Sequence, residues 1–162
     1  MSTNNLNPQT VADRFQDFNG RLIAFVQQCP ADKWYWVTKA EGWPVGVTAH
    51  HVGAIHYPVL AWVQMMIEGT PTPAITMTDV DEMNRQHVVA QADCTVADVV
   101  LLLQQEEEKI LAYLRTLDET ALHREAYLKI FDTTMSAGQL FQAILLDSAE
   151  EHLTSLQATV QG

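Results

Sequence analysis

The feature that most constrains the fold is a helical repeat of apolar residues in four long segments. Apolar side chains return at intervals of three and four positions in residues 8–28, 45–68, 95–114 and 136–160. This spacing gathers them on one face of an α-helix, and no segment shows the alternation typical of a β-strand. Amphipathic helices of this length bury their apolar faces by packing against one another. We therefore predict an all-α fold, an up-and-down four-helix bundle, formed by a single domain over residues 1–162.

Prolines, glycines and capping residues mark the expected boundaries. Cys29-Pro30 should end the first helix, Pro58 should kink the second, and a loop follows at residues 69–73. Residues 79–91 form a short polar helix with too few apolar side chains for a core position, so we expect it to cap the bundle. Residues 119–134 show no strong period and are expected to form an ordered loop.

The amino-acid composition argues against some classes of binding partner. Nine Lys and Arg residues oppose twenty Asp and Glu residues, and the formal net charge is −11. A nucleic-acid partner is not expected, because such binding depends on cationic side chains, and the same charge disfavours anionic membranes. Residues 1–8 contain no basic region followed by an apolar run, and no apolar stretch of about 20 residues is present. We expect a cytoplasmic protein that acts on a small molecule.

Three of the six histidines lie in residues 50–56, in one predicted helix. His50 and His51 point about 100° apart, and His56 lies about 140° from His51, so this helix alone does not hold a metal ion. His51 falls on the apolar stripe that should face the core. We predict that His51 points inward, that His56 is half buried and that His50 lies at an edge.

A second histidine on an apolar stripe is His152 in the last predicted helix, which begins with a capping box at Ser136 and Gln139. A lone histidine on such a face is usually a core residue with one hydrogen-bond partner, whereas two facing histidines can form a site. The pocket candidates around this pair are His56, Arg85, His87, Glu107 and Asp147. For Arg85, His87 and Glu107, a solvated surface position is the simpler alternative.

Two short motifs resemble those of the DinB-like superfamily. They are Trp43-x-Val45-Gly46 followed by His51, and Glu151-His152-Leu153 in the last helix. The order of the helices, the loop at residues 69–73 and the short polar helix also fit, so the resemblance covers nearly the whole chain. This superfamily includes metal-dependent thiol transferases that use mycothiol or bacillithiol. The resemblance implies a four-helix bundle with a functional site among its helices.

The resemblance also implies a divalent metal ion, zinc or nickel, held by His51, His152 and the residue one turn before His152. That residue is Ser148, where the family commonly has His or Glu. A hydroxyl is a poor substitute for these ligands, and His87 or a glutamate of the third long helix could complete the site instead. Arg85 is the expected partner for an anionic part of cofactor or substrate.

Two functions remain open from the sequence. One is a transferase or isomerase that activates a low-molecular-weight thiol at the metal, and the other is a non-enzymatic small-molecule-binding or interaction module without a complete metal site. A homodimer is a candidate assembly for either. No histidine follows a glutamate by three positions, and neither His-Glu-x-x-His nor Gly-x-Ser-x-Gly occurs, which argues against di-iron bundles, zincins and serine hydrolases.

Overall fold

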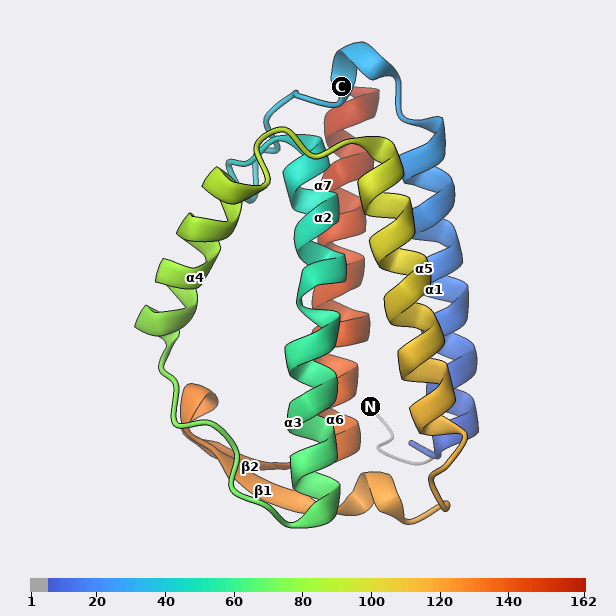
Figure 1. Cartoon of the computed structure of the whole chain (residues 1–162), viewed down its shortest axis with the longest axis vertical. Helices are drawn as coiled ribbons and strands as arrows, with labels where there is room; N and C mark the ends of the chain where they lie inside the picture. The colour runs from blue at the N-terminus through green and yellow to red at the C-terminus, as the bar shows by residue number, and fades with distance from the viewer. Residues whose placement is uncertain (1–5) are drawn as a thin grey trace.

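Four helical columns form the body of the molecule in the computed structural model, which describes residues 6–162 apart from the side chain of Tyr57 (Figure 1). The columns are α1 (Pro8–Gln28), α2 (Val45–Ala54) with α3 (His56–Glu68), α5 (Val96–Leu114), and α6 (Ala137–Phe141), which continues through a π-helical segment (Gln142–Ser148) into α7 (Ala149–Gln161). The shorter helix α4 (Met77–Ala90) lies beside them. The all-α four-helix bundle with one additional helix is therefore confirmed. Residues 1–5, which belong to the N-terminal segment without a predicted signal sequence, lie outside the described range.

The predicted boundaries have local causes. The side chain of Asn7 accepts a hydrogen bond from the backbone N–H of Thr10 at the start of α1. Capping boxes begin α4, α5 and α6, the last formed by Ser136 and Gln139 as predicted. The kink near Pro58 is also present, since the column changes from α2 to α3 at Ile55. The ring of Pro58 carries no N–H and crowds the carbonyl of Ala54, which interrupts the helix.

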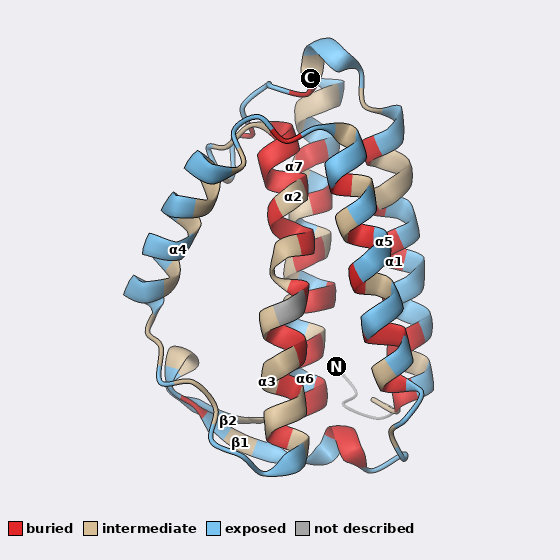
Figure 2. Ribbon diagram, in the orientation of Figure 1, coloured by how far each residue is buried: buried red, intermediate tan, exposed pale blue. Residues whose placement is uncertain are grey.

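Helix α4 is a return segment that stands away from the four columns. It carries the chain from the end of α3 back to the opposite end of the bundle, where α5 begins, so that α3 and α5 run in the same direction (Figure 1). The bundle is therefore not of the simple up-and-down kind that the sequence predicted, in which successive long helices alternate in direction. None of its residues is buried, in contrast to every long column (Figure 2). The polar segment predicted at residues 79–91 is thus a helix, but it covers one side of the bundle (Figure 1), whereas the sequence predicted a cap across an end.

The prediction of an ordered loop at residues 119–134 is incomplete, because this region contains a β-hairpin. Strand β1 (Glu125–Leu128) pairs antiparallel with β2 (Thr133–Ser136), and short 3₁₀-helices occupy Ala31–Lys33, Ala121–His123 and Lys129–Phe131. The strands have only four residues each, and their connection lacks an Asn-Gly or Asp-Gly pair, so the usual hairpin signals are missing. Asp132 adopts a left-handed conformation with φ 48° in the turn.

The π-helical segment changes which residues of the last column face the core, so that Ala149 and Leu153 are buried next to Ser148 and His152. Leu145 and Leu146 are buried in the core, whereas Ser148 and His152 are only partly buried on the flank of α7. A π-helical turn inserts an additional residue and shifts the register of the residues that follow. The apolar stripe predicted for this helix therefore fails at His152, which lies on the side of the bundle that α4 covers, whereas Leu156 further along is buried.

His56 is fully buried, which corrects the prediction of a half-buried side chain. Its ring lies edge-on to the ring of Phe15, with centroids 5.1 Å apart. Within the described residues, neither ring nitrogen has a hydrogen-bond partner. Burial lowers the pKa of His56 to about 3, because the charged imidazolium would lose its hydration.

No helix among the described residues is both long enough and apolar enough to cross a bilayer.

Gly46 is required by a close contact with Trp34. A Cβ atom at this position would lie 2.4 Å from the indole of Trp34, whose N–H donates to the carbonyl of Cys94. We expect Gly46→Ala to lower the free energy of unfolding by about 1–3 kcal/mol, because the buried ring must shift. Urea unfolding checks this, with Gly20→Ala as the control, since nothing lies within 4 Å of a Cβ atom there. Equal stability of the two variants would contradict the steric argument.

The buried His56 should make the protein sensitive to acid. The unfolded chain binds a proton at His56 near pH 6.5, whereas the folded chain does so only near pH 3, so stability falls as the pH drops between these values. In His56→Leu we expect the pH dependence of the free energy of unfolding to weaken by about 1.4 kcal/mol per pH unit between pH 6 and 4. Urea unfolding at several pH values measures it. The exposed His123→Leu is the control, and an equal effect there would refute the assignment.

Candidate functional site

Four imidazoles from three helices gather on the side of the bundle that faces α4. His50 and His51 lie on α2, His87 on α4 and His152 on α7. The ring centroid of His51 is 5.5 Å from that of His152 and 5.6 Å from that of His87. Nδ1 of His50 lies 3.3 Å from Nε2 of His87. The structure therefore brings together the two histidines predicted as ligands and adds two more beside them.

Glu41 fixes the orientation of His152. Its Oε1 lies 2.8 Å from Nδ1 of His152, and its Oε2 accepts a hydrogen bond from the hydroxyl of Ser155 at 2.7 Å. An ionised carboxylate only accepts hydrogen bonds, so the proton of the neutral ring lies on Nδ1 and the lone pair on Nε2. Burial raises the pKa of Glu41, but hydrogen bonds from His152, Ser155 and Thr38 outweigh this and leave the pKa below its usual value.

His51 is neutral at pH 7. Burial, reinforced by the nearby His152 and His87, lowers the pKa of His51 to about 4. Burial also lowers the pKa of His50 and of His87. Neutral imidazoles offer a lone pair, which is what a metal ion or an acidic proton requires.

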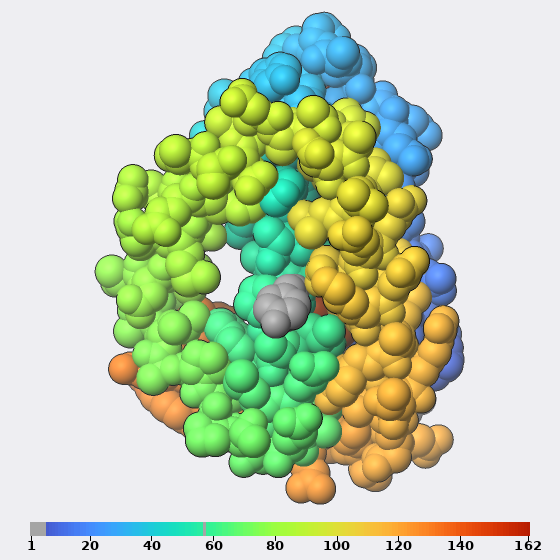
Figure 3. Space-filling model, viewed as in Figure 1, coloured from blue at the N-terminus to red at the C-terminus, as the bar shows by residue number. Residues whose placement is uncertain are grey.

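A cavity of about 340 Å³ opens beside His51 and His152. Its walls are mainly apolar side chains of α2, α3, α4 and the π-helical segment, among them Ile55, Val59, Trp62, Val80, Met83 and Ile144. The space-filling view shows an opening between α4 and the neighbouring column (Figure 3). The polar lining consists of His51, Asn84, Ser148 and His152, together with the indole of Trp43. The cavity is thus apolar, with imidazoles in one part of its wall.

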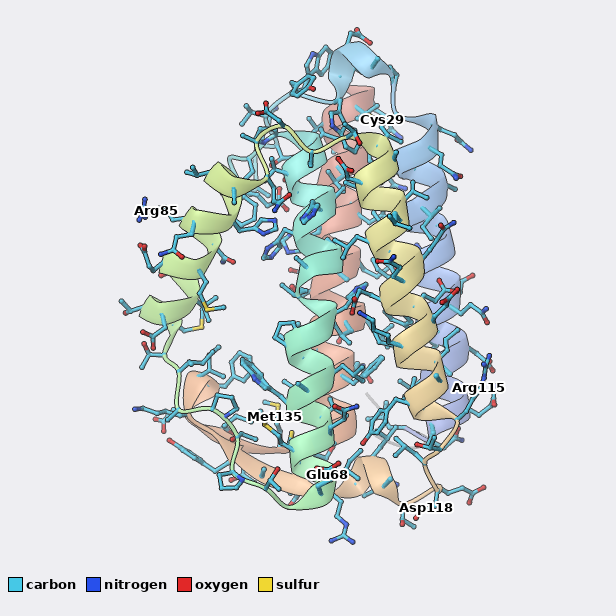
Figure 4. The ribbon with its side chains drawn as sticks, viewed as in Figure 1. Cys29, Glu68, Arg85, Arg115, Asp118 and Met135 are labelled. Carbon is cyan, nitrogen blue, oxygen red and sulfur yellow. The ribbon has the colours of Figure 1, made fainter. Side chains whose placement is uncertain are left out.

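The other predicted residues lie in different places. Asp147 is exposed, and Glu107 accepts a hydrogen bond from Asn19 between α1 and α5, so neither lines the cavity. Arg85 points away from the bundle and pairs with Glu82 (Figure 4). His56 is enclosed in the core. Only His87 of these pocket candidates lies within the histidine cluster.

Sequence reasoning missed Glu41, the closest polar partner of His152. It lies in the connector before α2, far from His152 in the sequence, and the pattern of apolar residues carries no information on such a contact. The sequence offers one indication that Glu41 belongs to the site: it lies two residues before Trp43, where the motif that leads to His51 begins. The ring of Trp43 lies 5.1 Å from that of His51 between centroids.

The donor set fits a divalent cation in part. His51 and His152 converge, and a carboxylate behind a histidine is a common support for a metal-binding imidazole. No group of three or more His, Cys, Asp and Glu residues within the described range has the arrangement of a metal site. The third family position is the hydroxyl of Ser148. Two imidazoles suit zinc or nickel, but as a weakly held, exchangeable ion.

A sequence profile of the DinB superfamily matches residues 14–153. The chain belongs to the DinB superfamily. No curated protein matches the sequence. Membership agrees with the motifs around Trp43 and His152, which lie within or at the edge of the matched range.

Solved structures share the DinB fold of this chain at low sequence identity. YfiT from Bacillus subtilis, described as a probable metal-dependent hydrolase with an unusual four-helix bundle topology, has a TM-score of 0.75 and 14% identity, covering 99% of this chain and 89% of YfiT. An uncharacterised protein from Clostridium difficile 630 has a TM-score of 0.72 and 12% identity, with 94% of each chain covered. Another from Escherichia coli UTI89 has a TM-score of 0.66 and 10% identity, with 95% of each covered.

Replacing Glu41 should destabilise the protein in a pH-dependent way. Glu41→Ala leaves the partly buried donors of His152 and Ser155 without their acceptor, and we expect a loss of about 1–3 kcal/mol at pH 7. Because the pKa of Glu41 is lowered on folding, its stabilising contribution is present above its unfolded value of 4.5 and disappears as the pH falls. Unfolding at pH 7 and below pH 4 measures both effects. Glu151→Ala, an exposed carboxylate on α7, is the control, and an equal loss there would contradict the role of Glu41.

Proposed function

We propose that this protein is a metal-dependent enzyme that acts on a small molecule in the cavity beside His51 and His152. The observation that carries the proposal is the convergence of these two imidazoles, 5.5 Å apart between ring centroids, with Nδ1 of His152 held by Glu41. Zinc or nickel is the expected metal, because imidazole suits both ions. The description of YfiT as a probable metal-dependent hydrolase supports the same general class.

The residues of the chain have separate roles in this proposal. His51 presents a neutral nitrogen donor, and Glu41 accepts from Nδ1 of His152, which leaves Nε2 of His152 to face the cation. Ser148 and His87 are the neighbouring groups that can add a weak third donor or hold a polar atom of the substrate. A divalent cation bound here would lower the pKa of a thiol or of water and so supply a nucleophile at neutral pH.

The reaction class proposed is the transfer of a low-molecular-weight thiol, or an isomerisation that uses such a thiol. The family resemblance supports this class, with mycothiol or bacillithiol as the type of co-substrate. The apolar cavity would then hold the electrophilic reactant, away from water, next to the histidines. Exclusion of water from this space protects a reactive thiolate from competing proton transfer.

A second candidate is a non-enzymatic module that binds a small molecule without a metal. It is favoured by one observation, the serine at position 148, which leaves two strong donors in place of three. In this case His51 and His152 would contact the ligand directly by hydrogen bonds. The cavity and its apolar walls serve both candidates, so metal binding decides between them.

Metal titration separates the two candidates. We expect isothermal titration calorimetry with zinc and nickel to show one site in the wild-type protein, and at least about tenfold weaker binding in His51→Ala and in His152→Ala, since each removes one of two imidazole donors. Metal content after purification without chelator gives a second readout. His123→Ala is the matched control, because this histidine lies outside the cluster.

A variant with a third imidazole provides a second test of metal binding. Ser148→His places a third imidazole one turn before His152, and we expect it to raise zinc affinity by at least about tenfold. His87→Ala shows whether α4 contributes a donor. Absence of zinc and nickel binding in the wild-type protein would refute the metal-dependent function and leave the binding module.

A further inference from the structure

The polar side chains in the wall of the cavity restrict the kind of ligand that it can bind. Among the residues that the structure describes, its lining contains no Lys, Arg, Asp or Glu. The polar side chains are His51, Asn84, Ser148 and His152, and the remaining wall is aliphatic or aromatic. A pocket of this kind favours ligands by apolar contact and orients them with a few hydrogen bonds.

Arg85 on the covering helix and Glu41 behind His152 are already paired. Arg85 on α4 is exposed, points away from the bundle and pairs with Glu82 at 2.7 Å (Figure 4). Glu41 lies behind His152, where His152 and Ser155 occupy its two oxygens. Neither a cation nor a free carboxylate is therefore offered to a ligand by these residues.

The electrostatic surroundings disfavour an anion in particular. The formal net charge of the chain is −11, and the cavity lining within the described residues offers no cationic Lys or Arg side chain. An ionised ligand that enters an apolar cavity without an opposite charge loses its hydration and gains no ion pair. An uncharged ligand avoids this cost and still gains the apolar contacts.

We infer that the cavity of the metal-free protein binds an uncharged molecule with an apolar alkyl or aryl body, whose polar group faces His51 and His152. This inference rests on the proposed function, because it names the class of reactant held in the same cavity. The volume of about 340 Å³ lies near the lower end of ligand pockets, about 300–1,000 Å³, and indicates a small molecule. The two indoles in the wall, Trp43 and Trp62, report on its binding.

A titration of metal-free protein with ligands of equal length tests the charge preference. The probes are 1-octanol, octanoate and octylammonium, added in the presence of chelator, and the readout is the indole N–H signals in ¹H–¹⁵N NMR spectra. We expect 1-octanol to shift the signals of Trp43 and Trp62 in a saturable way, with those of Trp34 and Trp36 unchanged as internal references. Octanoate and octylammonium should bind at least about tenfold more weakly.

Three results would overturn the inference. They are equal or tighter binding of octanoate, equal or tighter binding of octylammonium, and a response to 1-octanol that is absent or affects all four indoles alike. Because the metal is removed, each of these results leaves the metal titration unaffected. Conversely, a failure to bind zinc and nickel would leave this titration unchanged, so the two proposals fail separately.

A lysine introduced into the cavity wall should reverse the preference for 1-octanol over octanoate. Met83 lines the cavity from α4 and is 55% exposed, so Met83→Lys adds a cation without disturbing the core. We expect octanoate to bind this variant more tightly than 1-octanol does. Val89→Lys is the matched control, since Val89 lies on the same helix outside the cavity wall and is 71% exposed. An unchanged preference in Met83→Lys would show that the ligand binds elsewhere. Circular dichroism checks that both variants fold.

Discussion

The return of the chain from the end of α3 to the start of α5 is the constraint on which the cavity depends. Since α3 and α5 run in the same direction, the chain must travel the length of the bundle between them. Helix α4 covers this distance, but its sequence has too few apolar residues to pack into the core, and none of them is buried. It therefore stands beside the bundle and encloses a space that the four columns alone would leave open.

The histidine site follows from two local irregularities at the same level of the bundle. The interruption at Ile55 separates α2 from α3, and the π-helical segment Gln142–Ser148 precedes α7. Ala149 and Leu153 fill the core, while Ser148 and His152, one position earlier in each case, lie on the flank that faces α4. His56, on the other side of the α2–α3 break, remains enclosed in the core. Regular helices would place these side chains differently, so the irregularities position the site.

The chemistry of the cluster depends on burial as much as on residue type. Burial keeps His51 neutral, and the Glu41 hydrogen bond sets the tautomer of His152, so both present lone pairs near the same space. Ser148 limits how tightly a metal can be held and makes the site sensitive to a single added imidazole. The described cavity lining contains no Lys, Arg, Asp or Glu, which is the basis for the inferred preference of the metal-free cavity for uncharged molecules.

The sequence by itself determined the helices, because apolar periodicity, capping boxes and prolines act over a few residues. It located α1, the kinked α2–α3 column, α4 and α5, and it paired His51 with His152 through the resemblance to the DinB-like superfamily. The tertiary structure decided the hairpin, the full burial of His56, and the partnership of Glu41 with His152. These features depend on contacts between residues far apart in the chain, and local spacing contains no record of such contacts.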